Sequence, residues 1–199
     1  MEKIISKQSR NRDWWYARSV LYPTLGWNAL LGRTLRLRRW WDPIDEHVIL
    51  GARPFRKDVA ALAALGVGGV VNTCEEFCGP LDLYRQHGIE QFHMPTIDFT
   101  HPVLQDIDRA LEFMDRIIAS GHKVYVHCKA GRGRSATVVM AYLLTRKGMT
   151  AADAQSLLLS KRPHVNRHLT ERPVIQEIVQ RQNALVQNAG SLSPDSSTK

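Results

Sequence analysis

A cysteine stands between a short run of strand-forming residues and a glycine-rich turn, and this junction is the strongest constraint on the fold. The run is KVYVHC (123–128), which ends in this cysteine; the glycine-rich turn follows it, and a largely apolar stretch, SATVVMAYLLTRKG (135–148), comes directly after the turn. The run favours a β-strand, and an apolar stretch of that length favours a buried helix. The chain is therefore expected to form a layered domain in which a buried strand leads through a tight loop into a buried helix.

Strand-like and helix-like segments alternate along the rest of the chain. Strands are predicted at 47–52, 67–72 and 89–94, helices at 58–66, 81–88, 103–121 and about 170–187, and Thr150 with Asp153 predicts a capped helix start between them. Such alternation is typical of an α/β domain with a central, mostly parallel sheet flanked by helices. Residues 188–199 have the composition of a disordered tail.

The predicted loop after strand 123–128 combines glycines with basic residues, a composition that suits a phosphate. Glycines let successive backbone amides converge, and the N-terminus of the following helix directs its partial positive charge to the same place. Ligands of open α/β sheets bind at this carboxyl edge of the strands. Arg134 has the planar fork that grips two phosphate oxygens at once. The predicted phosphate-binding residues are Lys129, Ala130, Gly131, Arg132, Gly133, Arg134 and Ser135.

Cys128 is the predicted nucleophile of this loop. A positive field favours the thiolate form of a cysteine, and a thiolate beneath a bound phosphate can form a phosphocysteine intermediate. The leaving alkoxide then needs a proton, and Asp98, in the loop after strand 89–94, is the predicted general acid. We expect Ser135 to hydrogen-bond the departing sulfur, and His127 to orient the loop or tune the thiolate.

These residues resemble the cysteine-dependent dual-specificity phosphatases. VHCKAGRGRS matches the HCxxGxxR[ST] loop of that family, and Asp98 stands where the family keeps its general acid. Within the family, WWDPIDEHVILGARPF (40–55), GVVNTCEEF (69–77) and VYVHCKAGRGRSAT (124–137) are similar to the mitochondrial phosphatidylglycerophosphate phosphatases. The resemblance implies a protein tyrosine phosphatase-like fold of the dual-specificity type, with a catalytic domain over residues 40–187.

The same resemblance implies roles for residues around the loop. The lipid phosphatases have an acidic loop of the type NEEYE, and here that place reads CEEFC, so Glu75 and Glu76 are expected to support the site. Phosphoinositide phosphatases carry basic residues at the positions of Lys129 and Arg132, which implies contact with a second substrate phosphate. The alternative is that both of these side chains point to solvent.

The chain has three cysteines, Cys74, Cys78 and Cys128. An odd number implies no disulfide framework and favours a reducing compartment. No second pair of Cys or His accompanies Cys74 and Cys78, so we expect no metal site and regard both as small apolar residues. The family resemblance leaves either of them as a candidate to form a disulfide with Cys128 under oxidation.

Basic charge is concentrated in the N-terminal segment. Residues 1–41 carry nine Lys and Arg against two acidic residues, and they contain all five tryptophans. Basic residues interleaved with Trp and Tyr favour an anionic membrane surface over nucleic acid, and the longest uncharged run, 19–32, is too short to span a bilayer. We expect residues 1–39 to be a membrane-associating or targeting segment, with peripheral contact through 1–41. The alternative is an arm that packs its tryptophans on the domain.

The leading hypothesis is a monomeric enzyme that needs no cofactor and removes a phosphate monoester from an anionic phospholipid. The resemblance implies phosphatidylglycerophosphate as substrate. It also implies a peripheral location at the inner mitochondrial membrane of a eukaryote, or otherwise at the cytoplasmic face of a membrane. A phosphoinositide or phosphoprotein phosphatase and a non-catalytic phosphate-binding module are the alternatives. Arsenate reductases also contain a CxxxxxR loop, but they place it near the N-terminus beside partner cysteines, and this chain does neither.

Overall fold

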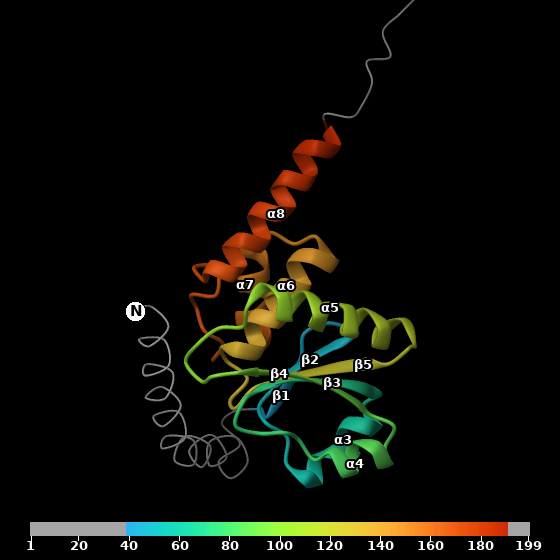
Figure 1. Cartoon of the computed structure of the whole chain (residues 1–199). Coiled ribbons are helices and arrows are strands. Elements are labelled where there is room, and N and C mark those ends of the chain that lie inside the picture. The colour runs from blue at the N-terminus through green and yellow to red at the C-terminus, as the bar shows by residue number, and fades with distance from the viewer. Residues whose placement is uncertain (1–38, 191–199) are drawn as a thin grey trace, which may run out of the picture.

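A computed structural model describes residues 39–190, which form a sheet with helices on both of its faces (Figure 1). The strands are β1 Trp41–Pro43, β2 Val48–Gly51, β3 Val67–Cys74, β4 Glu90–Thr96 and β5 Lys123–His127. The helices are η2 Arg56–Asp58, α3 Val59–Ala64, α4 Leu81–Gln86, α5 Leu104–Ala119, α6 Arg134–Lys147, α7 Ala151–Lys161 and α8 Pro173–Gly190.

The sheet has the strand order β1-β2-β5-β3-β4, and β5 lies at its centre. β5 pairs in parallel with β2 and with β3, so Val126 lies between Leu50 and Val71, and all three side chains are fully buried. β4 is also parallel, and β1 alone is antiparallel to its neighbour. The expected mostly parallel α/β architecture is confirmed. Because β5 is central, Cys128 leaves the sheet in the middle of its carboxyl edge.

Helices α5 and α6 cover one face of the sheet, and α3 and α4 cover the other (Figure 1). Every residue of α6 from Arg134 to Leu144 is buried, because α5, α7 and α8 surround this helix on the side away from the sheet. The approach of α5 to β3 depends on Gly69, where an added Cβ would lie 2.7 Å from Cγ1 of Ile117. A buried helix directly after the loop therefore holds the loop's end in place.

Several boundaries differ from those expected. β4 continues to Thr96, two residues past the predicted end, and so carries the backbone closer to Asp98. β1 was not predicted, since a three-residue segment with Asp and Pro has little strand propensity of its own. Helix α8 reaches Gly190, three residues beyond 187. The capped start of α7 is confirmed, because the Thr150 hydroxyl accepts a hydrogen bond from the Asp153 amide.

Two of the five tryptophans, Trp40 and Trp41, lie in the described domain. Trp40 stacks on Phe55 with ring centroids 5.3 Å apart, and Trp41 meets the ring of Tyr125 edge-on at 6.2 Å. These two side chains pack on the domain, as in the alternative interpretation, and peripheral membrane contact through 1–41 stays a prediction. The other three tryptophans fall within residues 1–38. Those residues and residues 191–199 lie outside the described part of the chain.

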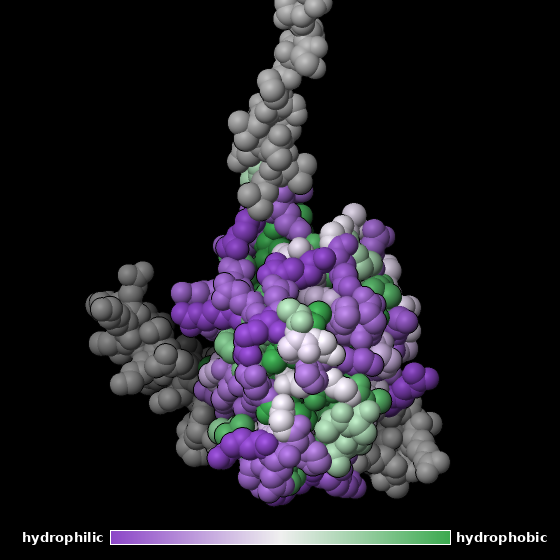
Figure 2. Space-filling model, turned by 90° about the vertical axis from the view of Figure 1, so that its right-hand side faces the viewer, coloured by the Kyte–Doolittle hydropathy of each residue, from purple (hydrophilic) through white to green (hydrophobic). Residues whose placement is uncertain are grey.

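The described surface is mixed in character. On the face seen in Figure 2, apolar residues are scattered among hydrophilic ones. The large hydrophobic side chains that are most exposed are Leu65, Leu81, Phe99 and Val103. Within residues 39–190, no helix is both long enough and apolar enough to cross a membrane.

Candidate active site

Cys128 follows the last residue of β5, and its sulfur lies inside the loop that leads to α6. The sulfur accepts hydrogen bonds from the Gly131 amide and the Ser135 hydroxyl, both at 3.2 Å. Burial by itself raises the pKa of this thiol. The charge of Arg134 and hydrogen bonds from Ser135 and the Arg132 amide outweigh burial and leave the pKa below its ordinary value. The loop therefore stabilises a thiolate, as the sequence predicts.

The shape of the loop depends on Gly131, which the sequence indicates, and on Arg162, which it does not. Gly131 has a φ of +68°, and an added Cβ there would lie 2.5 Å from the carbonyl oxygen of Gly51. Arg162, which is 1% exposed, donates to the carbonyl oxygens of Gly131 and Ala130 at 2.9 and 3.1 Å. Its Nη1 also donates to Asp42 Oδ2 at 2.6 Å. These bonds hold two loop carbonyls outward, so that the amides can face the sulfur.

Arg134 is the first residue of α6 and is anchored by the acidic loop after β3. Its Nη1 and Nη2 donate to Oε2 and Oε1 of Glu76, each at 2.9 Å, and Nη1 also donates to the Thr96 carbonyl oxygen. Burial alone would lower the pKa of the guanidinium, but Glu76 and Cys128 raise it above its ordinary value. Nε is buried and has no hydrogen-bond partner within the described residues. This free edge is available to a phosphate oxygen.

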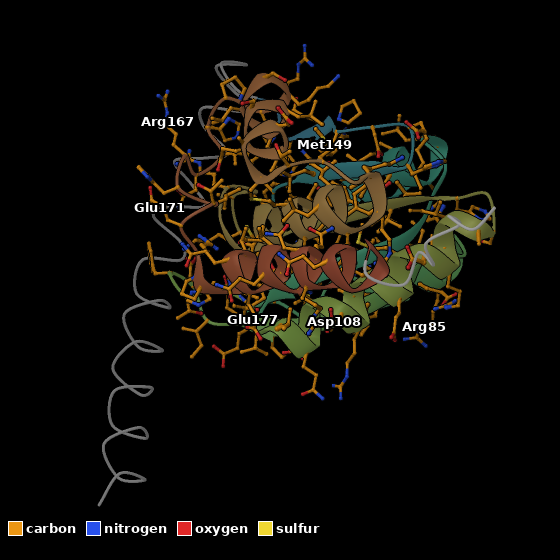
Figure 3. The ribbon with its side chains drawn as sticks, turned by 90° about the horizontal axis from the view of Figure 1, so that it is seen from above. Arg85, Asp108, Met149, Arg167, Glu171 and Glu177 are labelled. Atoms are coloured by element: carbon orange, nitrogen blue, oxygen red, sulfur yellow. The ribbon has the colours of Figure 1, made fainter. Side chains whose placement is uncertain are left out.

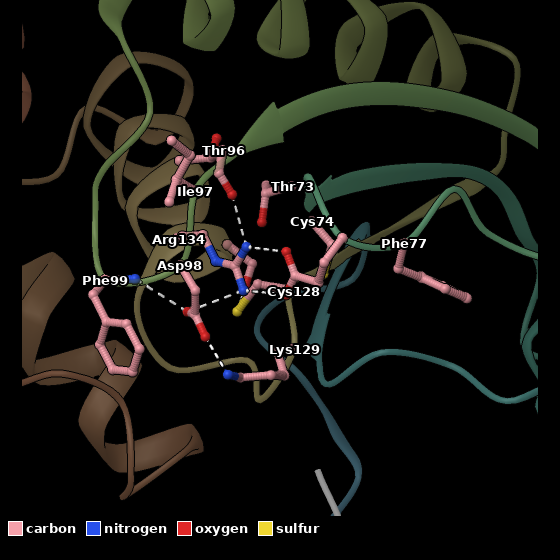
Figure 4. A network of polar contacts seen from close by, with 12 residues as sticks. Thr73, Cys74, Phe77, Thr96, Ile97, Asp98, Phe99, Cys128, Lys129 and Arg134 are labelled. Carbon is pink, nitrogen blue, oxygen red and sulfur yellow. Dashed lines mark hydrogen bonds and ion pairs between the residues drawn. The ribbon is translucent and has the colours of Figure 1, made fainter. Parts of the chain in front are cut away.

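Asp98 lies over the same loop, in contact with two cations (Figure 4). Its Oδ1 is 3.0 Å from Nη2 of Arg134, and its Oδ2 pairs with Nζ of Lys129. The Phe99 amide also donates to Oδ1, at 3.2 Å. The side chain of Lys129 is 7% exposed, so the alternative that it points to solvent is wrong. The expected acid, the nucleophile and the phosphate-binding arginine are therefore brought together.

A cavity of about 420 Å³ opens above Cys128. Part of its wall is the loop after β4, which contains the expected general acid Asp98 and Phe99. Another part of the lining comes from the segment between α7 and α8, which sequence reasoning did not connect with the site. The residues that line the cavity are Asp98, Phe99, Thr100, Cys128, Lys129, Ala130, Arg132, Gly133, Arg134, His164, Asn166 and Arg172.

Residues 48–177 match the family model described as "Dual specificity phosphatase, catalytic domain". This match covers more than half of the chain and includes every residue of the site. The chain belongs to the dual-specificity phosphatase family.

Relatives of this phosphatase carry informative names. It is 43% identical over 171 residues to "Phosphatidylglycerophosphate phosphatase PTPMT2" of Arabidopsis thaliana, a match that covers 84% of this chain and 75% of the relative. It is 34% identical to "Phosphatidylglycerophosphatase and protein-tyrosine phosphatase 1" of Mus musculus, with 81% of this chain and 88% of the relative covered. The structure titled "Crystal Structure of PTPMT1 in complex with PI(5)P" superposes with a TM-score of 0.63 at 32% identity, over 72% of this chain and 99% of that one.

His127 lies in a packed, apolar environment in this phosphatase. Its ring stacks on Tyr125 with centroids 5.6 Å apart and meets the ring of Phe77 edge-on at 6.1 Å. Complete burial lowers the pKa of the imidazole to about 3, so the ring is neutral at physiological pH. The expected orienting or thiolate-tuning role stays a prediction. The hydrogen bonds that the sulfur receives from Gly131 and Ser135 involve other residues.

The two glutamates of the acidic loop differ in position. Glu76 points inward onto Arg134, whereas Glu75 is exposed. Burial by itself raises the pKa of Glu76, but the hydrogen bonds and charge of Arg134 outweigh it and lower the pKa.

The other two cysteines are free thiols. Cys74 is buried at the end of β3, and burial raises its pKa well above the ordinary value, whereas Cys78 is exposed. A disulfide with Cys128 under oxidation stays a prediction for either one. Within the described residues, no group of three or more His, Cys, Asp or Glu is arranged to hold a metal ion.

Proposed function

We propose that this phosphatase removes the monoester phosphate of phosphatidylglycerophosphate and releases phosphatidylglycerol and inorganic phosphate. The observation that carries the chemistry is that Cys128 lies in a phosphate-sized loop with Asp98 held above it by Lys129 and Arg134. The lipid substrate is supported by the names of relatives that align over more than four-fifths of the chain.

In the proposed first step the Cys128 thiolate attacks phosphorus and forms an S–P bond, while the P–O bond to the lipid breaks. The loop amides and the free edge of Arg134 hold the phosphate oxygens, where charge develops in the transition state. Asp98, in its protonated form, gives its proton to the leaving alkoxide. A dianionic phosphate that binds Arg134 and Lys129 takes the place of the Asp98 side chain on these cations and leaves that side chain beside the leaving oxygen.

In the proposed second step water attacks the phosphocysteine, and the S–P bond breaks to release inorganic phosphate. Asp98 is now a carboxylate and accepts a proton from the attacking water. The Ser135 hydroxyl donates to the sulfur at 3.2 Å and stabilises the thiolate as it leaves. No cofactor takes part in either step.

A phosphoinositide is the second candidate substrate, because a solved relative is a complex with PI(5)P. Both kinds of lipid carry a second phosphate, in the diester to glycerol. Arg132 and Lys129 both line the cavity, so both remain proposed contacts for that group. The intact set of Cys128, Asp98 and Arg134 argues against a non-catalytic phosphate-binding module.

We also propose that the phosphatase works at a membrane surface, through the basic segment 1–39, as a monomer. Peripheral attachment to the inner mitochondrial membrane of a eukaryote, or to the cytoplasmic face of another membrane, fits a lipid substrate. Juxtamembrane Lys and Arg contribute about 1 kcal/mol each at an anionic surface, and salt weakens this attraction. Removal of 1–39 should therefore reduce binding to anionic vesicles and leave hydrolysis of a soluble aryl phosphate. Retention of Trp40 and Trp41 in this truncation preserves their packing on the domain.

The deciding experiment is a phosphate-release panel with and without vesicles. The substrates are phosphatidylglycerophosphate, each phosphoinositide, a phosphotyrosine peptide and a phosphorylated glucan. The highest kcat/KM is expected for phosphatidylglycerophosphate in anionic vesicles. A higher kcat/KM for a phosphoinositide or a phosphopeptide than for phosphatidylglycerophosphate would assign the enzyme to the other substrate class.

The Cys128→Ser variant tests the nucleophile itself. It should bind substrate, form no phosphoenzyme and retain less than about 1% of the wild-type rate, because a hydroxyl is a far weaker nucleophile than a thiolate. The wild-type activity should survive chelators and be inhibited by vanadate. A variant that retained substantial turnover would refute the phosphocysteine mechanism.

A further inference from the structure

The part of the cavity lining between α7 and α8 carries an arginine that the proposed chemistry does not use. Arg172 lies directly before Pro173, the first residue of α8, and lines the cavity together with Cys128. Its Nη1 donates to the Thr137 hydroxyl of α6 at 2.6 Å. Its backbone is held by bonds from its own amide to Leu169 and from the Ile175 amide to its carbonyl oxygen. The guanidinium is thus pre-positioned at the site.

Among the described residues, no carboxylate neutralises the charge of Arg172. The two fully buried arginines each have one: Arg134 pairs with Glu76 and Asp98, and Arg162 pairs with Asp42. Within residues 39–190 no carboxylate lies within ion-pair distance of the half-buried Arg172. Its partial burial lowers its pKa. A partly desolvated cation whose bonded partner is a neutral hydroxyl is typical of an anion-binding position.

Arg172 also lies where positive charge already accumulates. An added Cβ on Gly133 would be 3.2 Å from Nη2 of Arg172, so the guanidinium lies against the start of α6. The N-terminus of this 14-residue helix carries a partial positive charge. Arg132 lines the same cavity, and its carbonyl oxygen accepts from the amide of Asn166, a lining residue between α7 and α8, at 2.9 Å. The reactive phosphate is already served by the loop amides and Arg134, so this additional positive charge suits a second anion.

We propose that Arg172 binds the second anionic group of the substrate, the phosphodiester that joins the headgroup to the lipid glycerol. The class of ligand is a molecule that carries a phosphate monoester and a phosphodiester a few bonds apart. The inference rests on the proposed function in so far as a phospholipid monoester is the substrate class. It adds a specific subsite on the wall formed by residues 164–172.

The test compares soluble substrates that differ in the diester. Nitrophenyl phosphate and glycerol phosphate carry the monoester alone, and glycerophosphoglycerol phosphate, the deacylated headgroup, carries both groups. In Arg172→Met, the ratio of kcat/KM for the diester-bearing substrate to that for glycerol phosphate should fall about 10- to 100-fold, mainly through KM. Arg172→Lys should recover part of this ratio, since lysine keeps the charge but not the fork.

Arg167 provides the matched control. It lies in the same segment, is exposed, and points outward at the edge of the molecule (Figure 3). Arg167→Met removes the same charge from the chain, and its ratio should stay within about twofold of wild type. Thermal melting of all three variants checks that each is folded.

Three results would overturn the subsite. They are an unchanged ratio in Arg172→Met, an equal fall for all three substrates, and an equal effect of Arg167→Met. An equal fall would mean that Arg172 serves the reactive phosphate or the loop. Failure of the proposed function is a separate result: wild-type enzyme would then not hydrolyse phosphatidylglycerophosphate in vesicles, while the ratio among soluble substrates could still depend on Arg172.

Discussion

Nη2 of Arg134 lies 3.0 Å from Oδ1 of Asp98, so the proposed phosphate-binding cation and the proposed general acid are in direct contact. The same guanidinium is held on its other side by Glu76. A substrate phosphate must therefore take the place of the Asp98 carboxylate on Arg134, whereas Glu76 can stay. This relationship makes the two carboxylates experimentally separable.

Asp98→Ala should lower kcat about 10²- to 10⁴-fold for alkyl phosphates, whose leaving groups need a proton. The fall should be much smaller for nitrophenyl phosphate, because nitrophenolate leaves as an anion and needs no proton. Steady-state kinetics with both substrates measures the difference. Asp106→Ala, on α5, is the control and should behave as wild type. Equal losses on both substrates would indicate a structural role for Asp98.

Glu76→Gln should lower kcat/KM on every substrate about 10-fold or more, because Arg134 loses the carboxylate that fixes its plane. Glu75→Gln changes the neighbouring exposed residue and should stay within about twofold of wild type. Both variants remove one negative charge from the same loop, so they differ only in which glutamate is changed. If the two variants lost activity equally, the loop as a whole rather than the Glu76 pair would be responsible.

Arg162→Met should destabilise the fold by about 3–5 kcal/mol, because it leaves Asp42 buried without its partner. Urea unfolding measures the change. Arg39 also approaches Asp42, at 3.7 Å, but its side chain is 81% exposed, so Arg39→Met should cost less than about 1 kcal/mol. At urea concentrations below the unfolding transition, Arg162→Met should also be less active than wild type, since two loop carbonyls lose their donor. Similar stability of the two variants would contradict a stabilising role for the buried Arg162–Asp42 pair.

From the buried His127 we predict how the free energy of unfolding depends on pH. Its pKa is about 3 in the folded protein and 6.5 as the ordinary value. Below pH 6.5 the unfolded chain therefore binds a proton that the folded one excludes, and stability falls as the pH drops from about 6.5 towards 3. The loss is about 2 kcal/mol at pH 5 relative to pH 7.5, at about 1.4 kcal/mol per unit. Urea unfolding of wild type and His127→Gln at both pH values measures it, and an unchanged slope in the variant would refute the assignment.

The nucleophile and its loop could be predicted from sequence because they depend on local order. A strand, two glycines and an apolar helix occupy consecutive positions, so Cys128 and Arg134 are placed by periodicity and by helix geometry alone. Asp98 could be predicted for a related reason, since it follows another parallel strand and such ends share one edge of the sheet. The mostly parallel sheet follows from the same alternation of segments.

Only the tertiary structure decided which distant charges meet. Arg162 and Asp42 are 120 residues apart, and nothing in either neighbourhood indicates that they form a buried pair behind the loop. The inward turn of Lys129 onto Asp98 and the position of Arg172 in the cavity lining likewise depend on how segments from distant parts of the chain converge. Periodicity determines which side of its own element a residue faces. Packing determines which side chain it meets there, because partners are selected by the free energy of burying charges that lie far apart along the chain.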